Sequence, residues 1–397
     1  MGIIPHEEEA ALILSSAAQT QHFHQPLLPE PKLICKVLVE SKKLWFVAAP
    51  SIFSRLAMFS MTVVTQAFAG HLGDLNLAAI SIATTVIISL AFGILSQLKT
   101  AVIAWVSGIA LAVHVLISWV FVYKLGVGIA GTAITLDFSW WLSVLGLFVY
   151  AVGGGCPLSW TGFSAQAFSE LWDFFKLSLA SGVMLFLENF YYRILIIVAG
   201  YLHNTETAID ALSICISIFA WESMISLGFL AATGVRVANE LGAGNANGAK
   251  FATLVSVITS LAVGIFFWSI IMAFHEALTM IFTSSSSVIT MVNKFSTLLA
   301  FTILFNCIQP VLSGTAVGSG WQGVVAYVNI GSYYLVGVPL GVFFGWLQFG
   351  ITGIWSGMIC GTVVQTLILA VITMKCNWER EAQNARSHIS NATSPSQ

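Results

Sequence analysis

Charged residues are scarce in this chain of 397 residues. Aspartate, glutamate, lysine and arginine make up only 8% of it, whereas a soluble domain carries about 25%. The formal net charge of −2 argues against nucleic-acid binding, which requires clustered basic residues. Hydrophobic residues make up 57% of the chain, more than a water-soluble fold of this length could cover with polar groups. We therefore expect most of the chain to lie in a lipid bilayer.

Motifs for metal, cofactor and nucleotide binding are also missing. The six cysteines are scattered without C-x-x-C spacing, so neither a zinc site nor a disulfide framework is indicated. The glycine-rich "ELGAGNANGAK" at 240–250 lacks the Lys-Ser/Thr pair of a phosphate-binding loop. We interpret it as a cytosolic turn. We predict no metal, no cofactor and no enzymatic activity.

Long apolar runs dominate the rest of the chain. A helix that spans a bilayer needs about 20 mostly apolar residues, and the runs lack the alternating pattern of membrane β-strands. We predict an all-α membrane protein with ten spanning helices, at 44–68, 77–95, 99–122, 131–152, 174–200, 208–233, 250–272, 293–316, 323–346 and 351–374.

Basic residues are unevenly distributed between the predicted loops. If the N-terminus is cytosolic, Lys124 and Lys294 fall outside, and the other basic residues in loops and tails fall on the cytosolic side. Because positive residues favour that side, we predict two cytosolic tails, 1–43 and 377–397. The segment Glu8–Ile13 resembles an acidic dileucine signal for the vacuolar membrane. A solvated tail that happens to contain leucines explains this segment equally well.

Two stretches of the chain are similar to each other. "FAGHLGDLNLAAISIA" begins at Phe68 and "VAGYLHNTETAIDALSICIS" begins at Val198, each at the exit of a long span. Transporters are often built from two related halves. Here 161–376 holds six predicted spans but 44–160 holds only four. The first half therefore lacks two helices, on the order of 80 residues with their loops, and the sparsest junction is 95/96.

Several long strings resemble one transporter family. "SMTVVTQAFAGHLGDLNLAAISIATT", "LENFYYRILIIVAG", "WESMISLGFLAATGVRVANELGAGN" and "SGTAVGSGWQGVVAYVNIGSYYLVGVPLG" are similar to plant multidrug and toxic compound extrusion (MATE, or DETOXIFICATION) transporters. The resemblance implies twelve helices in two six-helix lobes related by a pseudo-twofold axis. It also implies export of organic solutes in exchange for H⁺, or for Na⁺ in some members. Family members have two further helices at the 95/96 junction.

Ionisable side chains are costly inside a bilayer, so each one marks a candidate functional site. Glu188 lies in the middle of a predicted span, where burial favours its protonated form. In the family motif it takes the position of the seventh-helix glutamate implicated in proton coupling. An ion pair with Arg193 is the structural alternative, although five residues is a poor spacing for one helix face. We favour proton coupling.

Glu222 is the second candidate for proton coupling. It could face a central cavity, where Trp221 would offer an aromatic surface to an organic cation. A buried acid that is hydrogen-bonded to Ser223 or Ser226 is an equal alternative, because spacing alone does not aim the side chain.

Amide and aromatic side chains are candidates for lining the solute site. Many relatives carry an aspartate where this chain has Asn306, which cannot titrate. Either Glu222 supplies a second acid, or Glu188 works with Asn306 and Gln309 as hydrogen-bonding partners. The predicted solute contacts are Asn189, Tyr192, Trp221, Asn306 and Gln309.

His114 also lies in the middle of a predicted span. A lone histidine on an apolar helix is more often a packing residue than a proton relay, and we predict packing for it.

These features predict a monomeric, proton-driven antiporter of the vacuolar or plasma membrane. The family resemblance implies that its solutes are xenobiotics, flavonoid-type compounds or other secondary metabolites. The alternative is that the shortened chain does not transport, and either regulates a full-length partner or is degraded.

Overall fold

We describe the protein from a computed structural model, in which residues 33–70, 100–155, 206–393 and parts of 176–191 are described. The helices are α2 (Leu33–Gly70), α4 (Thr100–Trp119), α5 (Ile129–Tyr150), α7 (Glu206–Gly242), α8 (Ala246–Met280), α9 (Ser286–Gly318), α10 (Gln322–Asn329), α11 (Val338–Phe344), α12 (Gly350–Lys375) and α13 (Trp378–Thr393). Short π-helical stretches adjoin some of them, at Val120–Lys124, Ala151–Gly155, Ile330–Gly337 and Gly345–Phe349.

Eight helical segments of the described residues are long and apolar enough to cross a membrane. Their positions agree with eight of the ten predicted spans, and the all-α membrane class is confirmed. The predicted span 77–95 and the junction 95/96 lie outside the described residues, as does most of the span 174–200.

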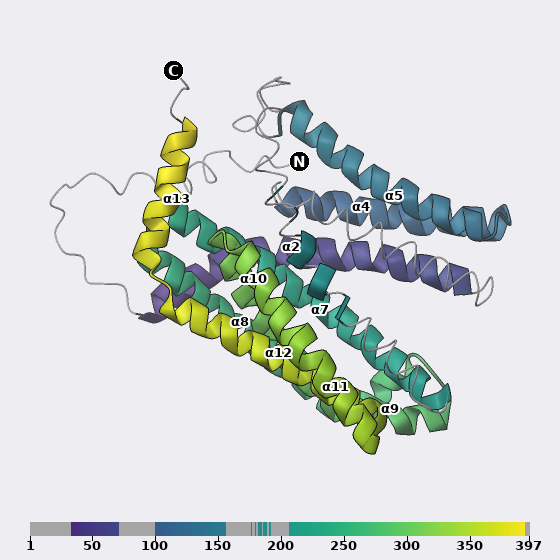
Figure 1. Cartoon of the computed structure of the whole chain (residues 1–397). Helices are drawn as coiled ribbons and strands as arrows, with labels where there is room; N and C mark the ends of the chain where they lie inside the picture. Colours follow the sequence, from purple (N-terminus) through teal and green to yellow (C-terminus); the bar gives the residue numbers. More distant parts are fainter. Residues whose placement is uncertain are drawn as a thin grey trace.

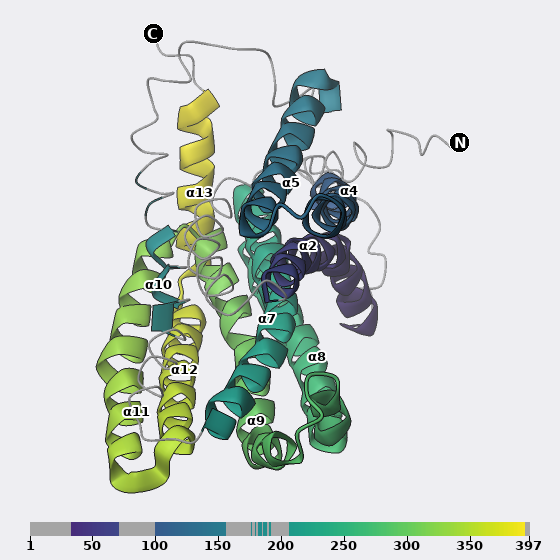
Figure 2. The ribbon, with the colours of Figure 1, turned by 90° about the vertical axis from the view of Figure 1, so that its right-hand side faces the viewer.

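The described helices form two groups that share α2. The N-terminal bundle is α2, α4 and α5, and its core contains Met58, Met61 and Trp140. The C-terminal bundle is α7 to α12, and its core contains Phe295 and Trp355. In Figure 1, α2, α4 and α5 diverge from α7, α9 and α11 toward the right of the view. In Figure 2, turned by 90°, α2 of the N-terminal bundle lies next to α7 and α8.

The helix α2 changes partners along its length. Its first half packs against the C-terminal bundle, where Leu44 and Ala48 contact the cluster around Phe229 of α7. Its second half packs against α4 and α5 through Met58 and Met61. The two bundles are therefore joined at one end and separate toward the other, as Figure 1 shows. We call the joined end, where α13 lies, the α13 end.

Several helices extend beyond their predicted spans. α2 begins at Leu33 instead of 44, so part of the predicted tail 1–43 is helical. The predicted tail 377–397 contains α13, whose Trp378 and Ala382 pack on Val237 and Leu241 of α7. A prediction based on runs of about 20 apolar residues does not include such extensions, because they are stabilised by contacts with other parts of the protein and not by lipid.

The predicted turn at 240–250 connects two helices. α7 ends at Gly242, and the side chain of Asn245 caps α8 by accepting a hydrogen bond from the Gly248 amide at 2.9 Å. Asparagine is a favoured residue at such N-caps. Gly244 has a φ of 73°, which glycine adopts at little cost.

Candidate functional site

The crossing of α7 and α9 brings a polar cluster together. A Cβ atom added to Gly314 would clash with the carbonyl oxygen of Leu230, and one added to Gly318 would lie 2.5 Å from the carbonyl oxygen of Gly234. Small residues four positions apart allow membrane helices to approach this closely. The crossing fixes which faces of α7 and α9 meet.

Glu222 of α7 is buried in this interface, with 4% of its surface exposed. Its Oε1 accepts hydrogen bonds from the Ser226 hydroxyl at 2.7 Å and from the Cys307 thiol at 3.3 Å. Its Oε2 lies 3.5 Å from the amide nitrogen of Asn306. Every one of these partners is neutral, and α9 supplies two of them.

The geometry distinguishes the two carboxylate oxygens of Glu222. Oε1 already accepts two hydrogen bonds, whereas the contact of Oε2 with Asn306 is long. A buried carboxylate without a cation is costly while ionised, and a proton on Oε2 would remove the charge without disturbing the bonds to Oε1. The donors around Oε1 in turn stabilise the ionised form. This arrangement can therefore bind and release a proton.

One of the two hydrogen bonds predicted for a buried Glu222 is present. The predicted hydrogen bond to Ser226 is present, while Ser223 donates to the Ala220 carbonyl oxygen instead. Asn306 of α9 contacts Glu222.

Trp221 faces the N-terminal bundle. The residue is 42% exposed, and its ring contacts that of Phe59 of α2 edge to face, with ring centroids 5.7 Å apart. Closer to the α13 end, Trp45 and Phe229 make a similar contact at 5.3 Å. The Trp221–Phe59 contact therefore lies farther from the α13 end than the Trp45–Phe229 contact.

Glu188 is also buried, with 8% exposed, on a partly described helical stretch. The hydroxyl of Tyr334 donates to the Leu187 carbonyl oxygen at 2.8 Å, and the amide of Asn329 donates to the Met184 carbonyl oxygen at 3.2 Å. These bonds hold the backbone just before Glu188 against the α10–α11 span. The predicted contacts Asn189 and Tyr192, and the alternative partner Arg193, lie outside the described residues.

A second polar cluster adjoins the Glu188 stretch and was missed by sequence reasoning. The rings of Tyr191 and Tyr333 stack with centroids 4.3 Å apart. Tyr333 donates to Gln365 of α12, and the Gln365 amide donates to Asn329 at 2.5 Å. All four side chains are at most 2% exposed. We call these four residues the Tyr333 cluster.

Glycines make room for the Tyr333 cluster. The hydroxyl of Tyr191 donates to the Met358 carbonyl oxygen at 3.1 Å, and a Cβ on Gly361 would lie 2.6 Å from that hydroxyl. The stretch that carries Tyr333 is π-helical and is followed by Pro339 near the start of α11. π-Helical turns are frequent at functional sites. Asn329 and Gln365 are neutral, so the cost of placing a charge inside a bilayer does not mark them as candidates.

Gln309 lies on α9 but bonds to neither glutamate. Its amide nitrogen donates to the Ser313 hydroxyl at 3.0 Å, one turn later on the same helix. The prediction that Gln309 and Asn306 together serve Glu188 is therefore not what the described contacts show, because Asn306 contacts Glu222.

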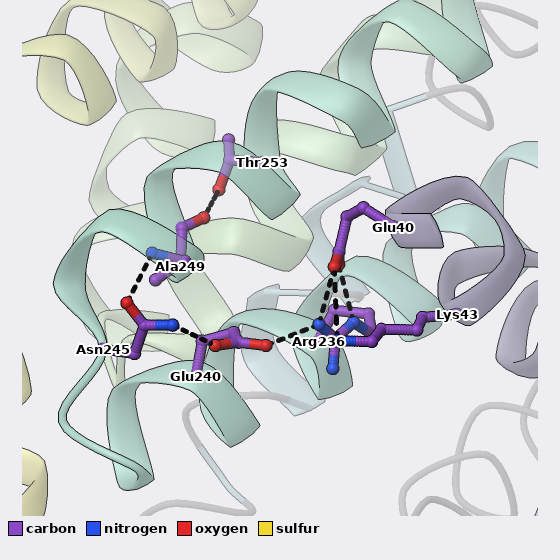
Figure 3. A network of polar contacts seen from close by, with 8 residues as sticks. Glu40, Lys43, Arg236, Glu240, Asn245, Ala249 and Thr253 are labelled. Atoms are coloured by element: carbon purple, nitrogen blue, oxygen red, sulfur yellow. Dashed lines mark hydrogen bonds and ion pairs between the residues drawn. The ribbon is translucent and has the colours of Figure 1, made fainter. Parts of the chain in front are cut away.

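A third polar cluster joins the two bundles at the α13 end (Figure 3). The guanidinium of Arg236 donates to both carboxylate oxygens of Glu40, at 2.8 and 3.0 Å, and to Glu240 at 2.6 Å. Asn245 donates in turn to Glu240 at 2.8 Å. Lys43 lies 3.9 Å from Glu40 at the edge of this network. We call the contact of Arg236 with Glu40 and Glu240 the Arg236 clamp.

Comparisons with known proteins identify the family. A family model described as MatE matches residues 180–343. DETOXIFICATION 27 of Arabidopsis thaliana is 47% identical over 446 residues, covering 89% of this chain and 92% of that protein. The chain is a member of the MATE family.

Other relatives agree with this assignment. DETOXIFICATION 26 of Arabidopsis thaliana is 43% identical over 89% of this MATE protein and 91% of its own length. The crystal structure of the eukaryotic MATE transporter AtDTX14 matches with a TM-score of 0.82 and 25% identity, over 89% of this chain and 99% of that one. The Vibrio cholerae MATE transporter VcmN in its bent form shares the fold, with a TM-score of 0.68 and 15% identity over 88% of this chain and 99% of that one.

Membership confirms the resemblance inferred from the sequence. MATE proteins are membrane transporters of small molecules, so this chain is a multi-pass transporter of the multidrug and toxin extrusion class.

Proposed function

We propose that this MATE protein is a proton-driven antiporter of organic solutes. The observation that carries the proposal is Glu222, a carboxylate buried in the membrane interior with neutral hydrogen-bond donors around it. Intramembrane carboxylates of this kind serve as proton relays in transporters. Glu188, buried beside the Tyr333 cluster, is the second proton-coupling residue. Na⁺ is the competing coupling ion.

The solute would bind between the two bundles, close to Trp221. Trp221 is half-exposed, and its ring contacts Phe59 of α2. Its π face would attract an organic cation. Asn189, Tyr192, Asn306 and Gln309 are the further solute contacts of this proposal. The solute class is xenobiotics, flavonoid-type compounds or other secondary metabolites.

We also infer that the N-terminal lobe lacks two helices at 95/96. The support is the alignment with DETOXIFICATION 27, whose 446 positions include only 89% of the 397 residues here, or about 353. About 93 aligned positions therefore have no residue from this chain. This number is large enough for two membrane helices and their loops. A chain so shortened could instead be a regulator of a full-length partner or a product that is degraded.

The protein would act as a monomer in the vacuolar or plasma membrane, with both termini in the cytosol. The support for this orientation is the charge at the α13 end, where Lys36, Lys43, Arg236, Lys250 and Lys375 lie near the ends of their helices. Positive residues favour the cytosolic side of a membrane.

Reconstitution tests the proposal against its alternative. The chain is placed in proteoliposomes beside a chimera in which the corresponding DETOXIFICATION 27 segment restores the junction 95/96. Uptake of ethidium, a fluorescent aromatic cation, and of a flavonoid glucoside is measured under an imposed H⁺ or Na⁺ gradient. We expect both proteins to accumulate one of these solutes under the H⁺ gradient. Uptake by the chimera alone would favour the non-transporting alternative.

A further inference from the structure

His114 of α4 is buried at the centre of the N-terminal bundle, with 0% exposed. Its Nε2 lies 3.0 Å from the Thr65 hydroxyl of α2. Its Nδ1 lies 3.0 Å from the Ser139 hydroxyl and 3.3 Å from the Thr135 carbonyl oxygen, both on α5. One imidazole ring thus links all three described helices of this bundle.

The hydrogens around His114 can be counted. The Thr65 hydroxyl donates to the Met61 carbonyl oxygen at 3.0 Å, and the Ser139 hydroxyl donates to the Thr135 carbonyl oxygen at 2.7 Å. A hydroxyl has a single hydrogen, so both oxygens present lone pairs to the ring. A doubly protonated imidazole satisfies both at once. A neutral imidazole has only one N–H, so one hydroxyl must then leave its carbonyl partner.

The ring nitrogens of His114 differ in their surroundings. Nδ1 also faces the Thr135 carbonyl oxygen, which can only accept, so Nδ1 keeps its hydrogen in both states. Nε2 faces the Thr65 hydroxyl, with the Met61 carbonyl oxygen of α2 also close to the ring. When Nε2 loses its proton, the Thr65 hydroxyl turns from the Met61 carbonyl oxygen to donate to Nε2. The charge of His114 is therefore coupled to a hydrogen bond within α2.

Among the described residues, no charged side chain faces His114 from the helices packed against it. α4 carries no other titratable group. On α2 the nearest is Arg55, ten residues before Thr65 and about 15 Å away along the axis. On α5, Asp137 is exposed, between the buried Thr135 and Ser139, and so lies on the opposite face. No neighbouring carboxylate among these residues holds the ring permanently charged, so the proton can leave.

We propose that His114 is a second proton-binding site of this transporter, in the bundle opposite the two glutamates. A proton from water binds Nε2 as a new N–H bond, and its release returns the Thr65 hydroxyl to the ring. Histidine is the side chain whose charge changes between about pH 5 and 8. The role in transport rests on the proposed proton coupling, whereas the binding of a proton does not. His114 is then more than the packing residue that the sequence predicts.

Nitrogen NMR of the full-length chain in lipid nanodiscs tests the site directly. Histidine is labelled with ¹⁵N, and the His114→Gln variant assigns its ring signals among the eight histidines. Glutamine can still donate to and accept from Thr65 and Ser139, so the variant is expected to fold. We expect the Nε2 signal to move from the neutral to the charged position as the pH is lowered. If the His114 ring keeps the same protonation state throughout the pH titration, the proposal is overturned.

Transport assays separate this proposal from the proposed function. In proteoliposomes, His114→Gln is expected to remove one limb of the pH profile of ethidium uptake while uptake itself persists. If the His114 ring titrates but His114→Gln leaves the pH profile of ethidium uptake unchanged, His114 is not coupled to transport. If the ring titrates but the unmodified chain moves no solute under a proton gradient, the proposed function fails and the proton site stands.

Discussion

Replacing Arg236 by glutamine should favour separation of α2 from α7 at the α13 end. The substitution leaves the carboxylates of Glu40 and Glu240 facing each other across the joined bundles, with side chains only 10% and 16% exposed. Removing one partner of a buried ion pair costs about 3–5 kcal/mol. The partial exposure of these groups puts the value at the lower end of that range. Separation of α2 from α7 would return Glu40 to water and relieve this cost.

Lowering the free energy of the open form by about 3 kcal/mol relative to the closed form changes their equilibrium constant roughly 100-fold, because 1.4 kcal/mol corresponds to a factor of ten. The reporter is a cysteine introduced in place of Ala48, which is 0% exposed and packs in the cluster around Phe229. Modification of this reporter cysteine by a water-soluble maleimide is followed by mass spectrometry. We expect the rate to rise by about 100-fold in Arg236→Gln. The native Cys215, 0% exposed in the C-terminal core, should stay unreactive.

Lys43→Gln is the matched control. Its ion pair with Glu40 is longer, at 3.9 Å, and its side chain is 39% exposed. Exposed pairs contribute about 0–1 kcal/mol, so the modification rate should change less than about 5-fold. An unchanged rate in Arg236→Gln would refute the role of the clamp in closing this end. Equal rises at the reporter cysteine and at Cys215 would refute it too, because the whole fold would then have been lost.

Two further substitutions test the site. Gly361→Ala places a methyl group 2.6 Å from the Tyr191 hydroxyl and should lower thermal stability in detergent by about 1–3 kcal/mol. Gly323→Ala, with no atom within 4 Å of the added Cβ, should change it little, and equal effects would contradict the tight packing of the Tyr333 cluster. Trp221→Ala should weaken ethidium binding by about 0.5–2 kcal/mol, as expected for a lost cation–π contact, and Trp221→Phe should restore part of it. Binding that is unaffected by Trp221→Ala would remove this ring from the solute site.

The sequence predicts the membrane segments well because each span is a local property of composition. The positions of α4, α5 and α9 follow from runs of about 20 apolar residues. The first turns of α2 could not be predicted in this way, since Glu40 is stabilised by Arg236, 196 positions later in the chain. A window along the sequence contains no information about such a pair.

For the candidate site, the sequence likewise predicts some contacts and not others. Glu222 could be singled out because an acid inside a span is costly, and its bond to Ser226, four residues later, follows from helical spacing. Its partners Asn306 and Cys307 come from another helix, and only the crossing at Gly314 and Gly318 brings them into reach. The Tyr333 cluster depends on three segments meeting, so spacing within any one of them does not indicate it.

Substitution of the two buried glutamates tests proton coupling most directly. Proteoliposomes that contain Glu222→Gln or Glu188→Gln are compared with the unmodified chain for ethidium accumulation under an imposed proton gradient. They are also compared for exchange of labelled against unlabelled ethidium, which needs no net proton movement. We predict that both variants lose accumulation but keep exchange. Full accumulation by both variants, at the rate of the unmodified chain, would contradict proton coupling through these carboxylates.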